Sequence, residues 1–181
     1  MVDPSDIPRI VSDAARLLRR GELVVFGSAA LAYWLENPPR TRDVDVWCSP
    51  AAEGDAIQAL MGELSWYDEK HGAYVEVWAP ETFSAPSDWR RRARVLQSDE
   101  RPAVTVIVAH PHDVLLAKLE RLDPHDLEHA ERILCEYPLD SKALDALLAK
   151  SPYRTRVIVE TDRRERFEHG VTKLRQMLAR S

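Results

Sequence analysis

The chain has 181 residues, of which 45% are hydrophobic and 30% charged, and its net charge is −5. This fits one compact domain, or a core with a small helical region, and excludes a polyanion binder that acts through overall charge. The sequence has no apolar run of about 18 residues and no secretion signal at its N-terminus, so we expect no membrane span. Two cysteines, Cys48 and Cys135, are too few for a disulfide framework or a cysteine metal site, which favours a reducing cytoplasm.

The first part of the chain alternates predicted helices and strands. Their order follows from hydrophobic spacing and from Gly and Pro breakers. They are a helix over 6–20 that Gly21 stops, a buried strand over 23–26, a helix over 28–36, a half-buried strand over 43–47, a helix over 51–64, a strand over 73–78, an irregular excursion with a short helix over 79–102, and a strand over 103–108.

The second part is predicted to be mostly helical. Helices are expected over 111–122, 124–136, 140–149 and 161–179, and Pro111 and Pro124 suit first helical positions. The pattern predicts an α/β (α+β) fold with a core over 1–110 and a helical region over 111–181, either as two domains or as a single one.

A glycine and a serine follow the first buried strand. Gly27 permits a positive φ and a close approach of a phosphate to the backbone, and the helix that follows presents free N–H groups. Ser28 adds a hydroxyl donor. The simpler alternative is that Gly27 turns the chain and Ser28 caps the helix.

Two aspartates lie inside the next strand. Residues two apart on a strand face the same side, so Asp43 and Asp45 project together while Val44 and Val46 face the other way. With 15 aspartates in the chain, about one Asp-x-Asp is expected by chance, so the setting carries the argument. Carboxylates within an apolar strand need a cation, and Mg²⁺ prefers oxygen ligands and phosphates.

Phe26-Gly27-Ser28 followed by Asp43-Val44-Asp45-Val46 resembles the signature of the nucleotidyltransferase (polymerase-beta-like) superfamily. More narrowly, the segments 27–31 and 40–45 look like those of AbiEii-type nucleotidyltransferases, which include toxins of toxin–antitoxin systems. The resemblance covers about residues 22–135. It implies a small mixed sheet flanked by helices, a nucleoside triphosphate substrate, Mg²⁺ or Mn²⁺, and an RNA (tRNA-like) or protein acceptor or partner, such as an antitoxin.

The resemblance also implies roles for further residues. Glu76 is the candidate third carboxylate for metal binding and catalysis. Lys118 and Arg42 would bind nucleotide phosphates, and Asp126 would have a catalytic or positioning role. Simpler alternatives are a solvated loop charge for Arg42, a packed helix for Lys118 and a first-turn acid for Asp126.

Two other functions are open. His125 stands where the family pattern has a basic residue, and His129 where it has an acid, so the fold could serve as a binding module without chemistry. His125, Glu128 and His129 also match the H-x-x-E-H pattern of a zinc hydrolase. The arginine-rich segment 90–94 is either an RNA contact or a solvated face.

Overall fold

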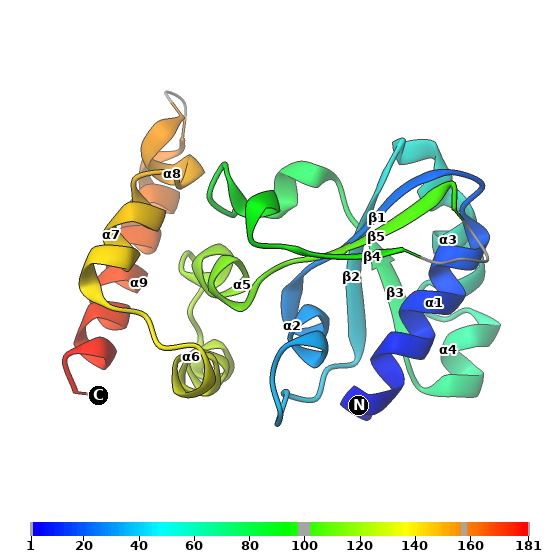
Figure 1. Ribbon diagram of the computed structural model, residues 1–181, viewed down its shortest axis with the longest axis horizontal. Coiled ribbons are helices and arrows are strands. Elements are labelled where there is room, and N and C mark those ends of the chain that lie inside the picture. Colours follow the sequence, from blue (N-terminus) through cyan, green and yellow to red (C-terminus); the bar gives the residue numbers. More distant parts are fainter. Residues whose placement is uncertain (1, 98–101, 157–158, 181) are drawn as a thin grey trace. The chain divides into compact units, whose positions relative to one another are not determined.

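The computed structural model describes residues 2–97, 102–156 and 159–180 (Figure 1). The chain divides into two compact units. The first comprises Met1–Thr82 and Arg92–His110, and the second comprises Phe83–Arg91 and Pro111–Ser181.

The first unit is a mixed sheet with helices. Its elements are α1 (Ile7–Leu17), β1 (Gly21–Val25), α2 (Gly27–Ala30), β2 (Asp43–Ser49), α3 (Gly54–Met61), α4 (Trp66–His71), β3 (Tyr74–Val77), β4 (Arg94–Gln97) and β5 (Val104–Val108), with 3-10 turns at Pro4–Asp6, Leu31–Tyr33, Ala51–Glu53 and Pro80–Thr82. The described strands have the order β3-β2-β1-β5-β4. The pairs β1/β2 and β4/β5 are antiparallel, and the pairs β1/β5 and β2/β3 are parallel. This confirms the predicted mixed α/β fold.

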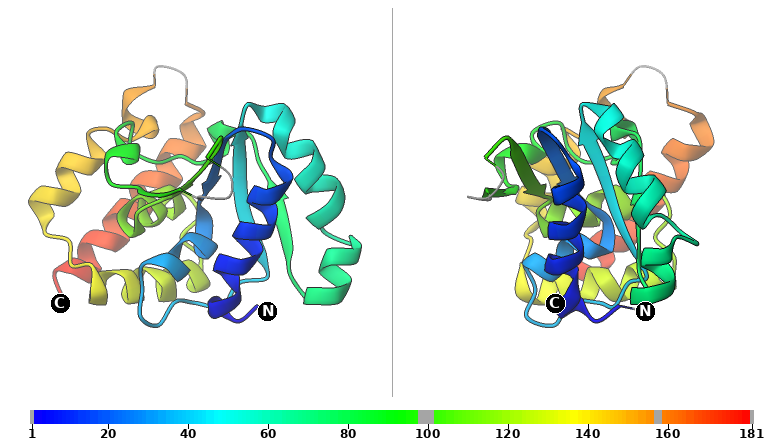
Figure 2. Two further views of the ribbon diagram at one scale, coloured as in Figure 1. Left: turned by 45° about the vertical axis from the view of Figure 1, so that its right-hand side comes forward. Right: turned by 90° about the vertical axis from the view of Figure 1, so that its right-hand side faces the viewer.

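Alternation along β2 separates the two faces of the sheet. Val44 and Val46 are fully buried, whereas Asp43 and Asp45 are half-buried on the opposite face. The helices α1 and α3 lie side by side on the valine face (Figure 2), and α3 begins against the side chains of Cys48 and Val77. The face of β2 that carries Asp43 and Asp45 is therefore not the one that α1 and α3 cover.

Some boundaries differ from prediction. Gly21 does not merely stop a helix, because it is the first residue of β1 and pairs with Val104. The helix expected over 28–36 is short: α2 ends at Ala30, and a 3-10 turn over Leu31–Tyr33 follows it. The chain is wound more tightly there than in an α-helix, because the N–H of Trp34 donates to the oxygen of Leu31, three residues earlier, at 3.0 Å.

Two elements of the first unit were not predicted. β4 lies in the segment expected to be irregular, of which residues 98–101 are outside the described chain. Its residues are mostly exposed, so pairing with β5 rather than hydrophobicity makes it a strand. The helix expected over 51–64 ends at Met61, and α4 follows it, capped by the Ser65 hydroxyl, which accepts from the N–H of Asp68 at 3.2 Å.

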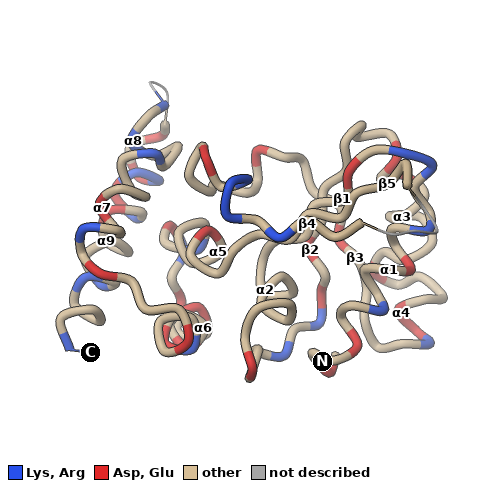
Figure 3. The backbone as a smooth tube through the Cα atoms, in the orientation of Figure 1, with Lys and Arg blue, Asp and Glu red and all other residues tan. Residues whose placement is uncertain are grey.

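The second unit is helical, as expected for the end of the chain. Its helices are α5 (Pro111–Lys118), α6 (Pro124–Glu136), α7 (Ser141–Leu148), α8 (Pro152–Thr155) and α9 (Thr161–Leu178), with a 3-10 turn at Trp89–Arg91. The short α8 was not predicted. Along α9, Phe167 and Leu174 are fully buried, and both acidic and basic residues occur along the same helix (Figure 3).

Candidate functional site

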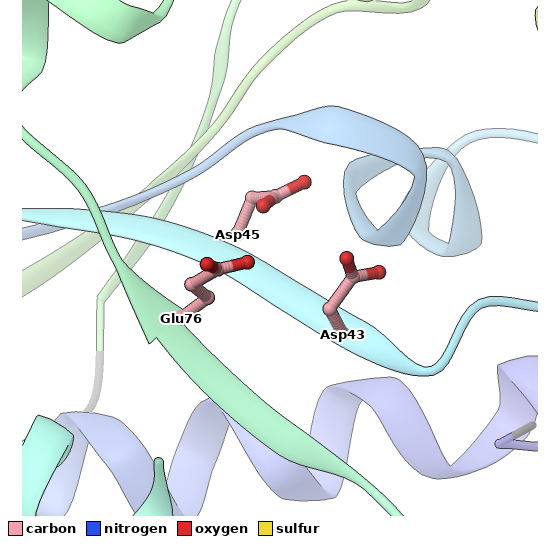
Figure 4. Close-up of side chains that lie close together, drawn as sticks. All are labelled: Asp43, Asp45 and Glu76. Carbon is pink, nitrogen blue, oxygen red and sulfur yellow. The ribbon is translucent and has the colours of Figure 1, made fainter. Parts of the chain in front are cut away.

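The acidic residues of β2 and β3 come together on one side of the sheet. β2 runs parallel to β3 with Asp45 opposite Glu76, so their side chains share a face with Asp43. Each of the three residues offers one carboxylate oxygen, and these atoms lie within 4.8 Å of one another (Figure 4). We call Asp43, Asp45 and Glu76 the acidic group.

Burial and neighbouring negative charges both favour the protonated form of Glu76. Burial raises the pKa of Glu76, and the negative charges of Asp43 and Glu63 raise it further. A carboxyl group in these surroundings holds its proton more tightly than one in water. A bound cation would reverse this effect, because it favours the ionised form.

Gly27 lies directly beside the acidic group. Its φ of +62° is in the left-handed region, and a Cβ atom built there would lie 2.0 Å from Oδ2 of Asp45. The N–H of Phe26 donates to the main-chain oxygen of Asp45 at 3.1 Å, which fixes this approach. Only glycine tolerates both the conformation and the contact. Ser28 follows half-buried in the first turn of α2.

Two further residues contact the acidic group, and sequence reasoning missed them. The Thr41 hydroxyl donates to Oδ1 of Asp43 at 2.6 Å, and the Trp78 indole N–H donates to Oδ1 of Asp45 at 2.9 Å. The period of a strand was the available signal, because Thr41 precedes Asp43 by two residues and Trp78 follows Glu76 by two.

Arg42 directly precedes Asp43, and its guanidinium contacts residues outside the acidic group. Its guanidinium lies 3.8 Å from a carboxylate oxygen of Glu63 and 3.7 Å from one of Asp68, and 5.4 Å from the ring centre of Tyr74. In this structure Arg42 links β2 to the residues around α4. Its predicted contact with a nucleotide stays a prediction.

Lys118 and Asp126 form a pair within the second unit. The ammonium of Lys118 lies 2.7 Å from Oδ1 of Asp126, whose side chain is fully buried, and Arg121 donates to the same carboxylate. Burial alone would raise the pKa of Asp126, but the hydrogen bonds from Arg121 and Lys118 lower it to about 2. Asp126 is therefore ionised at neutral pH and holds the Lys118 ammonium in place.

The histidines of α6 do not form a metal triad with Glu128. The rings of His125 and His129 lie 4.2 Å apart, but Glu128 pairs with Arg132 at 2.7 Å. Burial, followed by the charges of Lys118 and His125, lowers the pKa of His129 to about 4, so its ring is neutral at pH 7. Across residues 2–97, 102–156 and 159–180, the acidic group is the set of three or more potential ligands close enough to share an ion.

The fold and the acidic group define the class of protein. Two carboxylates on one strand, a third on its neighbour and a glycine turn beside them match the nucleotidyltransferase arrangement that the sequence suggested. Residues 6–176 match the family described as "Nucleotidyltransferase of unknown function (DUF6036)", and the chain belongs to that family.

The other comparisons add no relatives. No curated protein and no solved structure shows significant similarity to the chain. The family match supports the nucleotidyltransferase superfamily and does not reach the AbiEii-type subgroup. In the part of the chain that the structure describes, no helix is both long enough and apolar enough to cross a membrane.

Proposed function

We propose that the protein transfers a nucleoside monophosphate from a nucleoside triphosphate to an acceptor hydroxyl, with a divalent metal ion held by the acidic group. The observation that carries this proposal is the acidic group itself, in which three carboxylate oxygens lie within 4.8 Å of one another beside Gly27. The family description points to the same reaction class.

The donor set of the acidic group fits a hard divalent cation. All three donors are carboxylates, and each residue is half-buried, so an ion held there would keep a side open to water and substrate. Mg²⁺ takes oxygen ligands and usually retains several waters beside one or two carboxylates and substrate phosphates. We therefore propose Mg²⁺, with Mn²⁺ as a substitute.

The chain's own residues would orient the substrate and move a proton. Bound in the acidic group, the metal would supply charge to neutralise the phosphates and polarise the phosphorus under attack. Gly27 lets the main chain turn closely against Asp45, so that the start of α2 lies beside the acidic group, and Ser28 can donate its hydroxyl to a phosphate oxygen. Asp45 or Glu76 can accept the proton of the attacking hydroxyl.

Finer parts of the proposal concern substrates and context. We infer that the acceptor is an RNA, such as a tRNA, or a partner protein, and that the chain works in the cytoplasm as a short AbiEii-type nucleotidyltransferase. Lys118 would bind phosphate with Asp126 positioning it, since the ionised Asp126 carboxylate lies 2.7 Å from the Lys118 ammonium. These roles rest on the resemblance of residues 22–135.

A second candidate function is a binding module that keeps the fold and lacks turnover. One observation favours it: His129 is fully buried and uncharged at pH 7, where the superfamily pattern has an acid. Such a protein would hold a nucleotide or a partner and release it unchanged.

Labelled nucleotide transfer tests the proposal. The wild type and D43N/D45N are incubated with each labelled triphosphate, Mg²⁺, and either total RNA or total protein. We expect label in the acceptor with the wild type only. The matched control is D55N, because Asp55 is an exposed acid of α3. Equal labelling by wild type and D43N/D45N would exclude catalysis by the acidic group, and nucleotide binding without transfer would favour the binding module.

A further inference from the structure

We propose that Thr41 and Trp78 are positioning residues that orient Asp43 and Asp45 for metal binding. This inference rests on the proposed function, because it concerns the same acidic group. It adds two residues that neither the sequence motif nor the family description assigns. The supporting observations are the hydrogen bonds and the neutral charge of both donors, together with the burial of Thr41.

Thr41 is anchored at its backbone and bonded at its side chain. Its main-chain oxygen accepts from the N–H of Val2 at 2.8 Å, and the residue is 8% exposed. Its hydroxyl donates to Oδ1 of Asp43 at 2.6 Å, the shorter of its two contacts with this residue, the other being the main-chain oxygen at 3.1 Å. The hydroxyl therefore comes from a fixed point and limits the rotation of the Asp43 carboxylate. The second oxygen of Asp43 stays available to a ligand.

Trp78 does the same for Asp45. Its main-chain N–H donates to the oxygen of Val46 at 2.8 Å, which continues the β2–β3 pairing past the end of β3. Its indole N–H donates to Oδ1 of Asp45 at 2.9 Å, while Oδ2 lies on the side of Gly27. Asp45 is thus held between an indole on one side and a glycine backbone on the other.

The donors are neutral, and this matters for a cation site. A lysine or arginine in either place would cancel the negative charge that attracts the metal. A hydroxyl or an indole N–H fixes the carboxylate and leaves its charge intact, and an indole N–H cannot itself bind a cation. For Glu76 the described residues provide no such donor, so Glu76 is the member of the acidic group that is free to adjust.

Mn²⁺ binding by the full chain tests the inference without any need for activity. Free Mn²⁺ is titrated by electron paramagnetic resonance against the wild type, T41V, T41S and W78F. Removing a donor that orients a ligand usually weakens metal binding about 10- to 100-fold, and we expect losses of that size in T41V and W78F. T41S keeps the hydroxyl and is expected to stay within about threefold of the wild type.

Matched controls come from the same unit. Thr105 lies on strand β5 and Trp66 is 67% exposed on α4, and neither contacts the acidic group, so T105V and W66F should bind Mn²⁺ as the wild type does. Terbium luminescence adds a second measurement. With indole excitation, emission from saturating Tb³⁺ should be strongly reduced in W78F and retained in W66F.

The outcomes separate this inference from the proposed function. If D43N/D45N loses Mn²⁺ but T41V and W78F bind normally, the positioning role is overturned and the metal site stands. If T41S is as weak as T41V, the hydroxyl is not responsible, and the inference about Thr41 fails. If D43N/D45N binds Mn²⁺ like the wild type, the metal site of the proposed function fails.

Discussion

At the scale of single residues, the structure requires glycine at position 27 for two reasons: the main chain has a positive φ there, and a side chain would clash with Asp45. The φ of Gly27 is +62°, and an added Cβ atom would lie 2.0 Å from Asp45. Gly72 has nearly the same φ, +64°, with nothing within 4 Å of an added Cβ atom. An alanine at position 72 would therefore introduce backbone strain alone, whereas an alanine at position 27 would introduce the same strain and a clash with Asp45. We expect G72A to lower the free energy of unfolding by about 1 kcal/mol and G27A by about 3 kcal/mol.

Urea unfolding measures both variants, and Mn²⁺ titration distinguishes them further. G27A displaces the Asp45 carboxylate and should weaken Mn²⁺ binding, whereas G72A should leave it unchanged. Equal losses of stability in the two variants would show that the contact with Asp45 is unimportant.

The second residue-scale prediction concerns Glu76 and pH. Its pKa is raised above the ordinary value of 4.5 by burial and then by the charges of Asp43 and Glu63. The folded protein therefore binds this proton more tightly than the unfolded chain, so stability is lost as pH rises through the raised pKa. Without metal at pH 7, we expect E76Q to melt about 1–3 °C above the wild type, and the difference to vanish near pH 4.

Saturating Mg²⁺ should reverse the order of the two melting temperatures. With saturating Mg²⁺, the wild type gains binding free energy that E76Q lacks in part, so the wild type should melt higher. Differential scanning fluorimetry with and without EDTA checks both orders. A wild type that melts above E76Q in EDTA at pH 7 would contradict the repulsion argued for the acidic group.

Single residues were predictable where their type departed from the surroundings. Asp43, Asp45 and Glu76 are acids among buried valines, and the structure brings all three together. Thr41 and Trp78 are common in and beside strands, so their residue type does not mark them. The spacing of two residues from Asp43 and Glu76 places them on the acidic face, but their hydrogen bonds to the carboxylates depend on tertiary contacts that a local pattern does not contain.

At the scale of elements, Glu120 joins three segments of the second unit. It follows α5 and accepts from Arg163 and Arg166 of α9 at 2.7 and 2.9 Å, and from the hydroxyl of Tyr153 in α8. The bond from Arg163 is the main cause that lowers the pKa of Glu120 to about 2, against an opposing effect of burial. Its stabilising effect is present above pH 4.5 and lost as pH falls towards 2.

We expect E120Q to lower the free energy of unfolding by about 2 kcal/mol at pH 7, the size usual for hydrogen bonds to charged groups. The difference from the wild type should shrink at pH 3. E128Q is the control, because Glu128 forms an exposed pair with Arg132 on α6, which solvent screens, and its loss should leave the free energy of unfolding almost unchanged. Urea unfolding at both pH values measures these differences, and equal effects of the two variants would contradict the joining role.

Elements with strong periodicity were predicted, and those formed by pairing or capping were not. The valines of β2 and the helical apolar spacing of α1 and α9 identify these elements without tertiary information. β4 is a strand because β5 pairs with it, and α4 depends on the Ser65 cap and on Gly72 at its end. Such short elements are stabilised by particular contacts, so the composition of a window does not reveal them.

At the scale of the whole molecule, a net charge of −5 is compatible with metal and nucleotide binding because charges are distributed unevenly. The acidic group concentrates negative charge on one face of the sheet, while a run of basic residues precedes β4 (Figure 3). Local arrangement rather than total charge therefore decides which ions the protein attracts. The division of the chain over 1–110 and 111–181 stays a prediction, which unfolding experiments can test together with metal binding.

Metal addition should stabilise the whole chain measurably, since an ion held by the folded acidic group has no equivalent site in the unfolded chain. At a free concentration one hundred times the Kd, binding adds about 2.7 kcal/mol. For a chain of this size we expect Mg²⁺ or Mn²⁺ to raise the unfolding temperature by about 5–10 °C, and EDTA to reverse the shift.

Calorimetry of two variants tests where the ion binds. D43N/D45N should show no shift, whereas E120Q should unfold at a lower temperature without metal and then shift as the wild type does. If the units unfold separately, only the transition of the unit that contains the acidic group should move. A shift of the same size in D43N/D45N would place the stabilising ion elsewhere.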